Sequence, residues 1–448
     1  MSNVRDLQNK LTMFGQSHLL KFYDGLEKAE RESFIDELAA VNFEEINRLF
    51  KNAIAAMTGD VEKLDSRLRP IPESHFESEE KSSRETLDLY RKLGLEEISQ
   101  GRVGVLLMAG GQEEETGRKG MITWYIMTSG PTIQQTTKFL VDNNYFQLNS
   151  NNIVIFEQGL LPCFDFDGKI LLEDKGKISL APDGNGGIYR ALKKNGVLED
   201  MQKRGIKYVH AHSVDNILIK VADPIFVGYC VTKGADCGVK VVKKAYPTEA
   251  VGVVCQVDGQ FQVVEYSEIT DKTANLRDAE GNLVFNAGNI CNHFFSIDFL
   301  TLVADEYESL LKLHVAKKKI PFIDDNGKQI RPVAPNGIKI EKFVFDVFQF
   351  SNNFVTWEVP RYTEFSALKN SDDAGKDCPS TARRDVYHLH KKYVERAGGI
   401  VVGDEIEISP LLSYAGENLE AVVHGKTFKS PTHLLSKDEI IAANGTPN

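Results

Sequence analysis

The stretch VGVLLMAGGQEEETGRKGMITWYIMTSGPT, residues 103–132, decides the fold of this chain. It begins with an apolar run, Val103–Met108, that ends at Gly110 and Gly111, as a buried strand does where it meets a phosphate-binding loop. Three glutamates, residues 113–115, follow at a place where a phosphate would need backbone amides and cations. The loop therefore begins like a nucleotide site and then turns acidic.

Two familiar phosphate-binding motifs are absent from this stretch. The dinucleotide fingerprint GxGxxG does not follow the apolar run, which argues against a nicotinamide-dependent dehydrogenase. The spacing from Gly111 to Gly117, followed by Arg118 and Lys119, does not fit the P-loop pattern GxxxxGKS or GxxxxGKT. A glycine pair after a strand is more often a simple turn than a ligand site, so this loop alone defines no function.

Short β-rich runs alternate with helical stretches along the chain after Met108. Helical patterns are expected at residues 132–144 and 187–205. The alternation predicts βαβ units and an α/β fold with a mainly parallel sheet, covered on both faces, whose ligands bind beyond the carboxyl ends of the strands. The expected strands are Val103–Met108, Trp124–Met127, Ile153–Phe156, Tyr208–Ala211, Gly238–Val242, Val251–Val257 and Phe261–Tyr266. The last two are expected to form a hairpin through the sequence VDGQ.

Changes of pattern along the chain predict three consecutive regions. Residues 1–100 show apolar residues at three- and four-residue steps among charges, which predicts a helical N-terminal region that caps the next domain. Within it, RLRPIPESHFESEEKSS, residues 67–83, holds two prolines and many polar residues and is expected to be a surface connection. The α/β domain is expected at residues 101–370, and a small β-containing domain at residues 371–448.

The composition is that of an ordinary globular protein, with a formal net charge of −11 over 448 residues. An acidic chain argues against a nucleic-acid partner, which calls for a basic stripe or domain, but a local group of amides and lysines can still hold a phosphate. The six cysteines contain no CxxC pair, which favours reduced thiols over disulfides or zinc. No apolar run is long enough to span a membrane and no signal peptide is recognisable, so we expect a cytoplasmic protein without a membrane partner.

A glycine cluster in LAPDGNGGIYRAL, residues 180–192, is the second candidate loop. Gly184, Gly186 and Gly187 surround Asn185, and the segment runs directly into an amphipathic helical pattern. This arrangement permits a tight backbone and exposes amides and one carboxamide to a ligand. Because each glycine loses much entropy on folding, a binding role is favoured over a plain turn.

The segment IKYVHAHSVDNILIKVADP, residues 206–224, places Asp215 and Asn216 just past an expected strand. A carboxylate at that position can hold Mg²⁺, although an aspartate that caps a turn is an equally good interpretation of the segment alone. His210 and His212 lie two residues apart in the strand and therefore share a face. Without a third ligand in the pattern, packing or hydrogen bonding is favoured for these histidines over zinc.

Three asparagines occur in FNAGNICNHFF, residues 285–295, at positions 286, 289 and 292. Carboxamides both donate and accept hydrogen bonds, which suits sugar hydroxyl and N-acetyl groups. Lys339 in NGIKIEKFVFDVF and Lys369 in FSALKN are each lone lysines in an apolar setting. Such a lysine is usually solvated, but near a phosphate it would neutralise charge that develops during phosphoryl transfer.

These segments together predict an α/β protein that binds an anionic sugar or nucleotide. Neither a Ser-His-Asp set nor a Cys-His pair stands out in the sequence. That suits nucleotidyl transfer, in which catalysis consists mostly of positioning and charge stabilisation.

The chain resembles the eukaryotic UDP-N-acetylglucosamine (UDP-N-acetylhexosamine) pyrophosphorylases over nearly its whole length. The motifs that carry the resemblance are WYIMTSGPT, FEQGLLPC, LAPDGNGGIYRAL, YVHAHSVDNILIKVADP, GADCGVKVV, VEYSEI, FNAGNI and GIKIEKFVFDVF. The resemblance implies a Rossmann-like nucleotidyltransferase core with a mainly parallel mixed sheet, a helical N-terminal extension and a small β-containing C-terminal domain. It also implies a monomer or homodimer that makes UDP-N-acetylglucosamine and pyrophosphate from UTP and N-acetylglucosamine 1-phosphate with Mg²⁺. Some members of the family also accept N-acetylgalactosamine 1-phosphate.

The resemblance assigns roles to individual residues by motif. Asp215 would bind Mg²⁺, Lys369 would neutralise phosphate charge, and Asp215 and Lys339 would be the catalytic residues. Asn185 and Asn289 would hold the sugar. The nucleotide would contact Met108, Ala109, Gly110, Gly111, Gln158, Gly184, Asp215 and Lys339. The family reaction is an in-line attack of the sugar 1-phosphate oxygen on the α-phosphorus of UTP, with no covalent enzyme intermediate.

The opening stretch departs from the family pattern. Family members read AGGQGTRLG after the first strand, then a PKGM segment and a long helix before WYIMTSG, whereas Gln112 is followed here by EEETGRKGM. The sequence therefore resembles a family member with an internal deletion after Gln112, about one supersecondary unit in size. Such a deletion would remove the Gly-Thr-Arg cradle for the triphosphate and the PKGM lysine. In an alternative alignment, Lys119 takes the place of that lysine.

Two consequences of this deletion are expected. Losing the triphosphate cradle should impair catalysis by several orders of magnitude, because each cationic group at a phosphate contributes to the transition state. Losing the first crossover helix should uncover one face of the sheet and lower stability. The alternative function is a non-catalytic variant that binds nucleotide sugar or a partner subunit.

Overall fold

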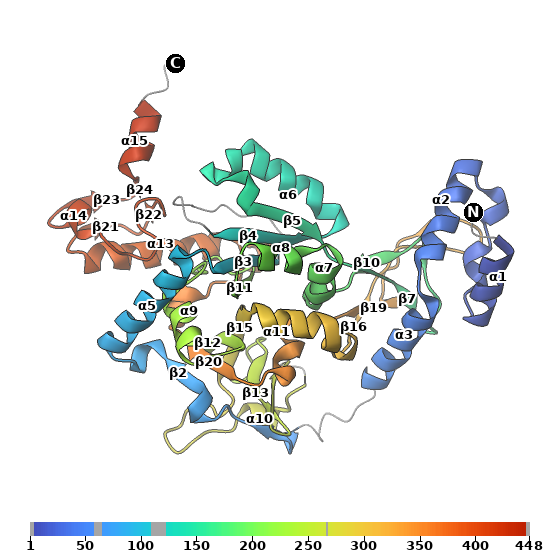
Figure 1. Cartoon of the computed structure of the whole chain (residues 1–448), viewed down its shortest axis with the longest axis horizontal. Helices are drawn as coiled ribbons and strands as arrows, with labels where there is room; N and C mark the ends of the chain where they lie inside the picture. Colours follow the sequence, from blue (N-terminus) through green and yellow to red (C-terminus); the bar gives the residue numbers. More distant parts are fainter. Residues whose placement is uncertain (1–3, 58–64, 109–121, 266–267, 445–448) are drawn as a thin grey trace. The chain divides into compact units, whose positions relative to one another are not determined.

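The computed structural model describes residues 4–57, 65–108, 122–265 and 268–444 (Figure 1). The chain folds into two compact units, each assembled from segments far apart in the sequence. The first unit comprises Met1–Lys63, Gln158–Lys194 and Val303–Val347, and the second comprises Leu64–Glu157, Asn195–Leu302 and Phe348–Asn448. This division differs from the three consecutive regions, 1–100, 101–370 and 371–448, that the sequence patterns predicted.

An 11-stranded mixed sheet forms the centre of the second unit. Its strands are β1 (Leu68–Arg69), β2 (Phe76–Ser78), β3 (Val103–Met108), β4 (Thr123–Thr128), β5 (Ile153–Glu157), β11 (Tyr208–Ser213), β12 (Cys237–Lys243), β13 (Val253–Val257), β14 (Gln260–Val264), β15 (Ala287–Ser296) and β20 (Phe354–Glu358). The main path runs β2-β20-β12-β15-β11-β3-β4-β5. Neighbours on this path are parallel except that β15 is antiparallel to both β11 and β12.

All seven strands expected from the sequence are present, with ends that differ by a few residues. Their apolar runs predicted them well because strands buried on both faces carry few polar residues. The expected hairpin joins β13 to β14, and its turn residues Asp258 and Gly259 have left-handed φ values of 52° and 82°. Two left-handed residues are typical of the tight type I′ turn.

Two crossing helices, α5 (Arg84–Ser99) and α9 (Pro224–Thr232), pack on one face of this sheet (Figure 1). Each contributes a glycine to the crossing. A Cβ on Gly94 would overlap the carbonyl oxygen of Pro224, and a Cβ on Gly228 would overlap that of Tyr90. The two backbones approach this closely only because both positions lack a side chain.

The opposite face of the sheet is covered by α8 (Val197–Lys203), which packs against α11 (Ile297–Leu302). Tyr125 of β4 points to this face, and its hydroxyl donates a hydrogen bond of 2.8 Å to Asp200 of α8. All residues of β3 and β4 are buried. The expectation that one sheet face would be uncovered is therefore wrong for the described residues, because α8, from a later part of the chain, covers β4. Helix α6 (Gly130–Asp142), which connects β4 to β5, packs against both of these strands.

Residues 67–83, expected to be only a surface connection, add two short strands to the sheet. Strand β1 pairs antiparallel with β13, and β2 pairs parallel with β20. Leu68 is buried in a small core with Val253 and Phe285, which explains why this segment folds onto the sheet. The two strands are too short to show an alternating pattern, so the sequence did not reveal them.

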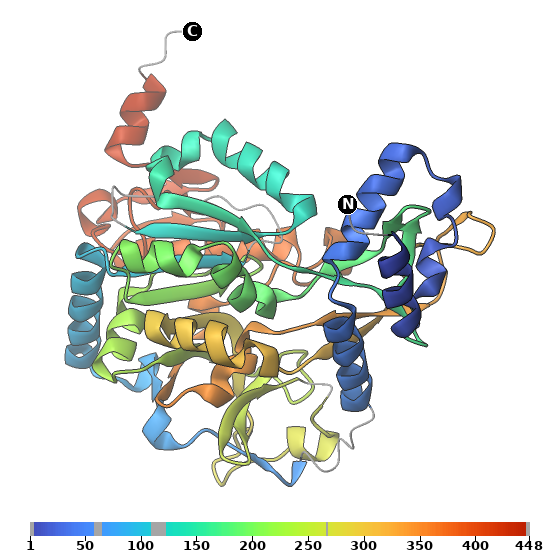
Figure 2. The ribbon, with the colours of Figure 1, turned by 45° about the vertical axis from the view of Figure 1, so that its right-hand side comes forward.

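The N-terminal helices α1 (Val4–Met13), α2 (Lys28–Ala40) and α3 (Phe43–Met57) belong to the first unit. They pack on its short strands, as Figure 2 shows for the blue helices beside the green and orange strands. These strands are β6 (Leu160–Pro162), β7 (Phe164–Asp165), β8 (Leu172–Asp174), β9 (Lys177–Ile178), β10 (Leu180–Pro182), β16 (His314–Lys318), β17 (Phe322–Ile323), β18 (Gln329–Ile330) and β19 (Gly337–Glu341). One shared apolar core therefore joins the helices to strands that follow them by more than a hundred residues.

The C-terminal part of the second unit contains the β strands that the sequence pattern predicted, and it packs around a small apolar core that also includes Leu218. Helix α13 (Pro379–Arg396) packs against β21 (Ile400–Val402) and β22 (Ile406–Ile408). These strands pair in parallel with β23 (Thr427–Lys429) and β24 (Thr432–Leu434), respectively. Helices α14 (Glu420–Val423) and α15 (Lys437–Asn444) complete this region.

The six cysteines are all free thiols, in agreement with their spacing. Within the described ranges, the structure contains no helix that is both long and apolar enough to cross a membrane.

Three histidines are buried in the second unit: His210, His212 and His293. Burial lowers their pKa values to about 3, 4 and 3, respectively. Histidine in an unfolded chain titrates near pH 6.5, so below that pH the unfolded state binds protons that the folded state does not bind. The contribution of these histidines to the free energy of unfolding is thus fully present above about pH 6.5 and is lost as the pH falls toward 3.

His293→Phe should make the stability of the protein less sensitive to acid. The ring of His293 contacts Phe295 and Phe348, and neither ring nitrogen has a hydrogen-bond partner among the described residues, so a phenyl ring can replace it. Each buried histidine should lower the free energy of unfolding by about 1.4 kcal/mol when the pH falls from 7.5 to 5.5. Urea unfolding at both values should show that the variant recovers about this amount. The same change at exposed His388 is the control, and identical pH slopes for parent and His293→Phe would contradict the assignment.

Candidate functional site

The carboxyl edge of the parallel strands β3 and β11 is where the sequence placed the candidate site. Met108, at the end of β3, lies opposite Ser213 at the end of β11. Met108 is buried, and the chain leaves both strands at the same edge of the sheet. Of the other residues expected in this loop, Ala109, Gly110 and Gly111 lie outside the described residues.

Asp215 and Lys369 are brought together at this edge, although they are far apart in the sequence. The Oδ2 atom of Asp215 lies 3.3 Å from Nζ of Lys369. The hydroxyl of Ser213 donates to Oδ1 of Asp215 at 2.5 Å, and the Leu368 amide donates to the Asp215 carbonyl at 2.8 Å. The Lys369 side chain is 62% exposed and that of Asp215 is 34% exposed, so a ligand from solvent can reach both.

Asp215 offers Mg²⁺ one carboxylate. Among the described residues there is no cluster of three or more His, Cys, Asp or Glu side chains that could hold a metal ion. Mg²⁺ commonly binds through one or two carboxylates together with substrate phosphates and water. The residues therefore fit an ion that arrives with a phosphate ligand, and they do not form an all-protein metal site.

Asn289 lies on β15 near the same pair of charges. Its Oδ1 atom accepts a hydrogen bond of 3.1 Å from the Cys291 amide, at a bulge where Cys291 has a left-handed φ of 54°. Burial raises the pKa of the Cys291 thiol to about 12, and Asp215 raises it further while Lys369 opposes the shift. Asn292 is the residue of β15 that pairs nearest the carboxyl end of β11, so Asn289, three residues earlier, lies beyond that end, at the edge that carries Asp215.

The other polar residues of these segments serve the fold. Asn292, which the sequence grouped with Asn289, is buried, and its Oδ1 atom bonds to Nε2 of His210. The Ala222 amide donates to Nδ1 of His210 at 2.9 Å, so the proton lies on Nε2 and the ring is neutral. Nδ1 of His212 bonds to the Ser213 carbonyl at 3.2 Å. Both histidines make hydrogen bonds of the kind that the sequence favoured for them.

The glycine cluster of residues 184–187 belongs to the first unit, where it packs against the chain that follows β19. The Gly186 amide donates to the Lys342 carbonyl, and the Lys342 amide donates to the Asp183 carbonyl, both at 2.8 Å. Gly184 has a left-handed φ of 85°. Oδ1 of Asn185 accepts a hydrogen bond of 2.9 Å from the Val344 amide. A sugar would therefore be bound by the amide nitrogen of the Asn185 side chain.

Gln158 and Lys339 lie on elements that lead to this cluster. Gln158 precedes β6, whose first residue, Leu160, pairs with Pro182 just before the glycine loop. Lys339 lies on β19, between β16 and β7. Gln158, Gly184, Asn185 and Lys339 therefore share the first unit, whereas Met108, Asp215, Asn289 and Lys369 share the second.

Sequence reasoning missed two buried polar residues beside these segments. Asp183 is buried, which raises its pKa to about 6 against the opposing charge of Lys342. Lys342 is also buried and forms an ion pair with Glu308. Lys342 stands among the apolar residues of KIEKFVF, which could have marked it as buried. The sequence pattern instead indicated Lys339, in the same run, as the functional lysine.

Comparisons with known proteins show the family to which the chain is similar. The family of UTP–glucose-1-phosphate uridylyltransferases matches residues 105–428. The chain is 43% identical to human UDP-N-acetylhexosamine pyrophosphorylase-like protein 1 over 499 positions, which cover 98% of each chain. It is 37% identical to UDP-N-acetylglucosamine pyrophosphorylase of Saccharomyces cerevisiae, over 94% of this chain and 98% of the relative. The crystal structure of the uridine diphosphate N-acetylglucosamine pyrophosphorylase from Trypanosoma brucei in complex with inhibitor superposes with a TM-score of 0.80 and 28% identity, over 98% of this chain and 99% of that one.

Gly184→Ala should destabilise the protein more than Gly15→Ala. Both glycines have a positive φ, of 85° and 71°, and Gly184 combines it with a ψ of 172°, a region that is essentially open only to glycine. A Cβ on Gly184 would also overlap the Lys342 carbonyl oxygen, whereas nothing lies within 4 Å of a Cβ on Gly15. Thermal unfolding should show the larger loss of Tm for Gly184→Ala. Equal losses would contradict the close approach of this loop to Lys342.

Proposed function

Because this chain belongs to the UTP–glucose-1-phosphate uridylyltransferase family, and within it to the UDP-N-acetylglucosamine pyrophosphorylases, we propose that it transfers a uridylyl group to an amino-sugar phosphate. The substrates are UTP and N-acetylglucosamine 1-phosphate, and the products are UDP-N-acetylglucosamine and pyrophosphate. The sugar phosphate oxygen attacks the α-phosphorus of UTP in line with the departing pyrophosphate. The pairing of Asp215 with Lys369 at the carboxyl edge of the sheet is the observation that carries the proposal.

The pair has the charges that this reaction needs. Lys369 is exposed enough to leave Asp215 and neutralise an incoming phosphate. Asp215 would then hold Mg²⁺, which supplies further positive charge to the phosphates when it is bound. Because the sugar phosphate is itself the nucleophile and is ionised at neutral pH, no protein base has to remove a proton.

The remaining residues are proposed to bind and orient the substrates. Met108, Gln158 and Gly184 contact the nucleotide, together with Ala109, Gly110 and Gly111 of the loop after β3. Asn185 and Asn289 hold the sugar, and Lys339 acts beside the phosphates as the second catalytic residue. We also propose a cytoplasmic protein, as a monomer or homodimer, with a Rossmann-like domain at 101–370 flanked by 1–100 and 371–448.

Impaired catalysis is proposed for this chain, because the connection from β3 to β4 is short. Residues 109–122 connect these adjacent parallel strands, whereas residues 129–152 connect β4 to β5 and contain α6, a helix of 13 residues. A crossover between parallel strands usually holds a helix together with turns at both ends. The alignment with the human relative spans 499 positions, more than the 448 residues of this chain, as an internal deletion after Gln112 would require.

The second candidate function is a non-catalytic protein that binds nucleotide sugar or a partner subunit. The same short connection favours it, since the family pattern places the triphosphate-binding Gly-Thr-Arg loop there. In this case the sugar and uridine contacts would persist while turnover would be lost.

Pyrophosphate release from UTP and N-acetylglucosamine 1-phosphate distinguishes the two functions. We expect turnover at least 100-fold slower than in a version with the family loop, PKGM segment and helix inserted after Gln112. Isothermal titration should still show UDP-N-acetylglucosamine binding to the parent chain. Equal turnover by the two versions would contradict the impairment, and binding without any turnover would establish the second function.

Asp215→Asn and Lys369→Ala should both weaken the site. In the loop-restored version each should lower kcat/KM for UTP by about 100-fold or more, since a charge on the phosphates in the transition state is lost. Their controls are Asp373→Asn and Lys376→Ala, which change exposed residues of the same segment as Lys369 and should leave kcat/KM unchanged within about twofold. Normal turnover by Asp215→Asn would rule out this residue as the metal ligand.

A further inference from the structure

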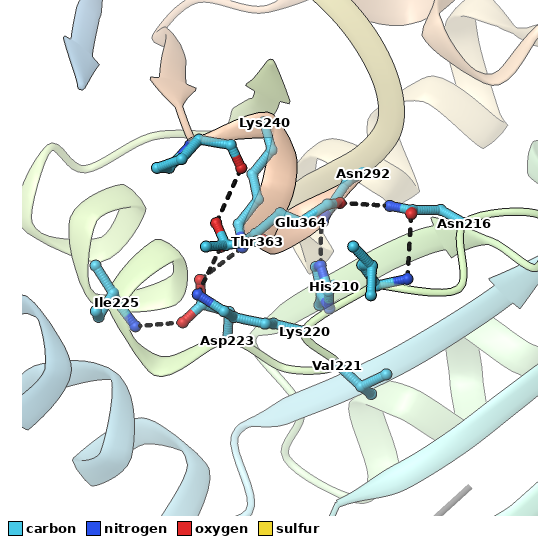
Figure 3. A network of polar contacts seen from close by, with 12 residues as sticks. His210, Asn216, Lys220, Val221, Asp223, Ile225, Lys240, Asn292, Thr363 and Glu364 are labelled. Atoms are coloured by element: carbon cyan, nitrogen blue, oxygen red, sulfur yellow. Dashed lines mark hydrogen bonds and ion pairs between the residues drawn. The ribbon is translucent and has the colours of Figure 1, made fainter. Parts of the chain in front are cut away.

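A cluster of buried charges lies beside the loop that carries Asp215 (Figure 3). Its centre is Lys240 of β12, which has no exposed surface. Nζ of Lys240 lies 2.6 Å from Oδ2 of Asp223 and 2.6 Å from Oε2 of Glu364. Nζ of Lys220 lies 3.0 Å from the other oxygen of Glu364. The two ammonium groups balance the two carboxylates.

The partners keep these groups charged despite their burial. Burial alone would raise the pKa of Asp223, but Lys240 and Lys220 hold it below its usual value. Burial alone would lower the pKa of Lys240, but Asp223 and Glu364 raise it above its usual value. A buried ion cluster contributes little net stability, because desolvation offsets most of the attraction between the charges. What the cluster does supply is a fixed geometry for the elements it joins.

Three elements meet at this cluster. Lys240 comes from the centre of the sheet, and Asp223 precedes α9, where its Oδ1 atom accepts a hydrogen bond of 3.0 Å from the Ile225 amide. Glu364 is the last residue of α12 (Arg361–Glu364) and has no exposed surface. The cluster therefore fixes the end of α12 against the sheet, and the chain continues from there to Lys369.

The side chain of Asn216 connects Glu364 to the loop after β11. Its amide nitrogen donates to the Glu364 carbonyl at 2.7 Å, and its oxygen accepts from the Ser366 amide at 3.0 Å and the Leu218 amide at 3.3 Å. Asn216 is only 2% exposed. Figure 3 shows this carboxamide between the two backbone segments.

These hydrogen bonds hold the segment from Phe365 to Ala367 on one side, and the Ser366 hydroxyl adds a hydrogen bond of 2.8 Å to Oδ2 of Asp385. On another side the segment borders a cleft. Phe365, Ser366 and Ala367 line this cleft, which has a volume of about 610 Å³. Two backbone bonds extend the connection, from the Ile217 amide to the Ser366 carbonyl at 3.0 Å and from the Leu368 amide to the Asp215 carbonyl at 2.8 Å. The residues at the two ends of this connection are Asp215 and Lys369.

We propose that Asn216 and Glu364 are positioning residues that set the separation of the Asp215 carboxylate and the Lys369 ammonium, and that Lys240 holds Glu364 in place for this purpose. The inference rests on the proposed function, since it concerns how Asp215 and Lys369 meet the phosphates of UTP. Neither Asn216 nor Glu364 is proposed to contact substrate. Each acts through the backbone of the segment that it holds.

A thermodynamic cycle tests this role. Binding of UTP with Mg²⁺ is measured by isothermal titration for the parent, Asn216→Ala, Asp215→Asn/Lys369→Ala and the triple variant, well below their unfolding temperatures. Asn216→Ala should weaken binding by about 10-fold in the parent and by less than twofold in the Asp215→Asn/Lys369→Ala background, because the groups that it positions are gone. The same weakening in both backgrounds would overturn the inference.

A second variant and a control separate positioning from general stability. Glu364→Gln keeps the shape and backbone carbonyl of Glu364 but removes the charge that Lys240 and Lys220 hold, and it should show the same dependence on background. Asp236→Ala is the matched control, since it loses bonds to the Asn352 and Asn353 amides at 2.8 and 3.2 Å and is not part of this cluster. It should lower Tm and leave UTP binding unchanged within twofold.

The two proposals fail in different ways. If neither the parent chain nor the loop-restored version binds UTP with Mg²⁺, both the proposed function and this inference are overturned. If only the loop-restored version binds, the same cycle is measured in that version. If the parent binds and Asn216→Ala and Glu364→Gln bind equally well, only the inference is overturned. Should Asn216→Ala not fold, Glu364→Gln takes its place in the cycle.

Discussion

The parallel pairing of β3 with β11 is the constraint on which the candidate site of the second unit depends. Because Met108 lies beside Ser213, both strands release the chain at one edge of the sheet. Strand β15 runs antiparallel and pairs Asn292 with His212, so its earlier residues, including Asn289, reach that same edge. Backbone hydrogen bonds of the sheet thus gather groups from distant segments, and side-chain contacts only adjust their final positions.

The main sheet could be predicted from the sequence, and the assembly of the units could not. Buried parallel strands are apolar along their whole length, so β3, β4 and β12 were visible as runs, and Asp215 was found by its place after β11. The spacing of Leu7 and Leu11 predicted an apolar helix face. Nothing in a periodic pattern says which segment covers such a face, and the partner strands begin more than a hundred residues later.

Polar residues mark the limit of sequence reasoning most clearly. Asn289 and Asn292 look equivalent in FNAGNICNHFF, yet Asn289 lies beyond the carboxyl end of β11 while Asn292 is bound to a buried histidine. Lys369 was selected from the sequence as a lone lysine in an apolar setting, whereas in the structure Lys240 of GVKVV is the lysine of these two that has no exposed surface. The difference lies in partners such as Glu364, more than a hundred residues from Lys240, which no local pattern contains.

The interleaved segments of the first unit also impose an order on folding during synthesis. Helices α1 to α3 leave the ribosome first, but their apolar faces pack on strands whose last members end at Glu341. At about 5–20 residues per second, the roughly 280 residues between Met57 and Glu341 take roughly 15–60 s to make. During the first part of that interval the helices can pack only on β6 to β10, and the surface of α3 that packs on β16 and β19 stays uncovered until those strands are made. A nascent chain of this protein therefore exposes part of an apolar core until its last partner strands are synthesised.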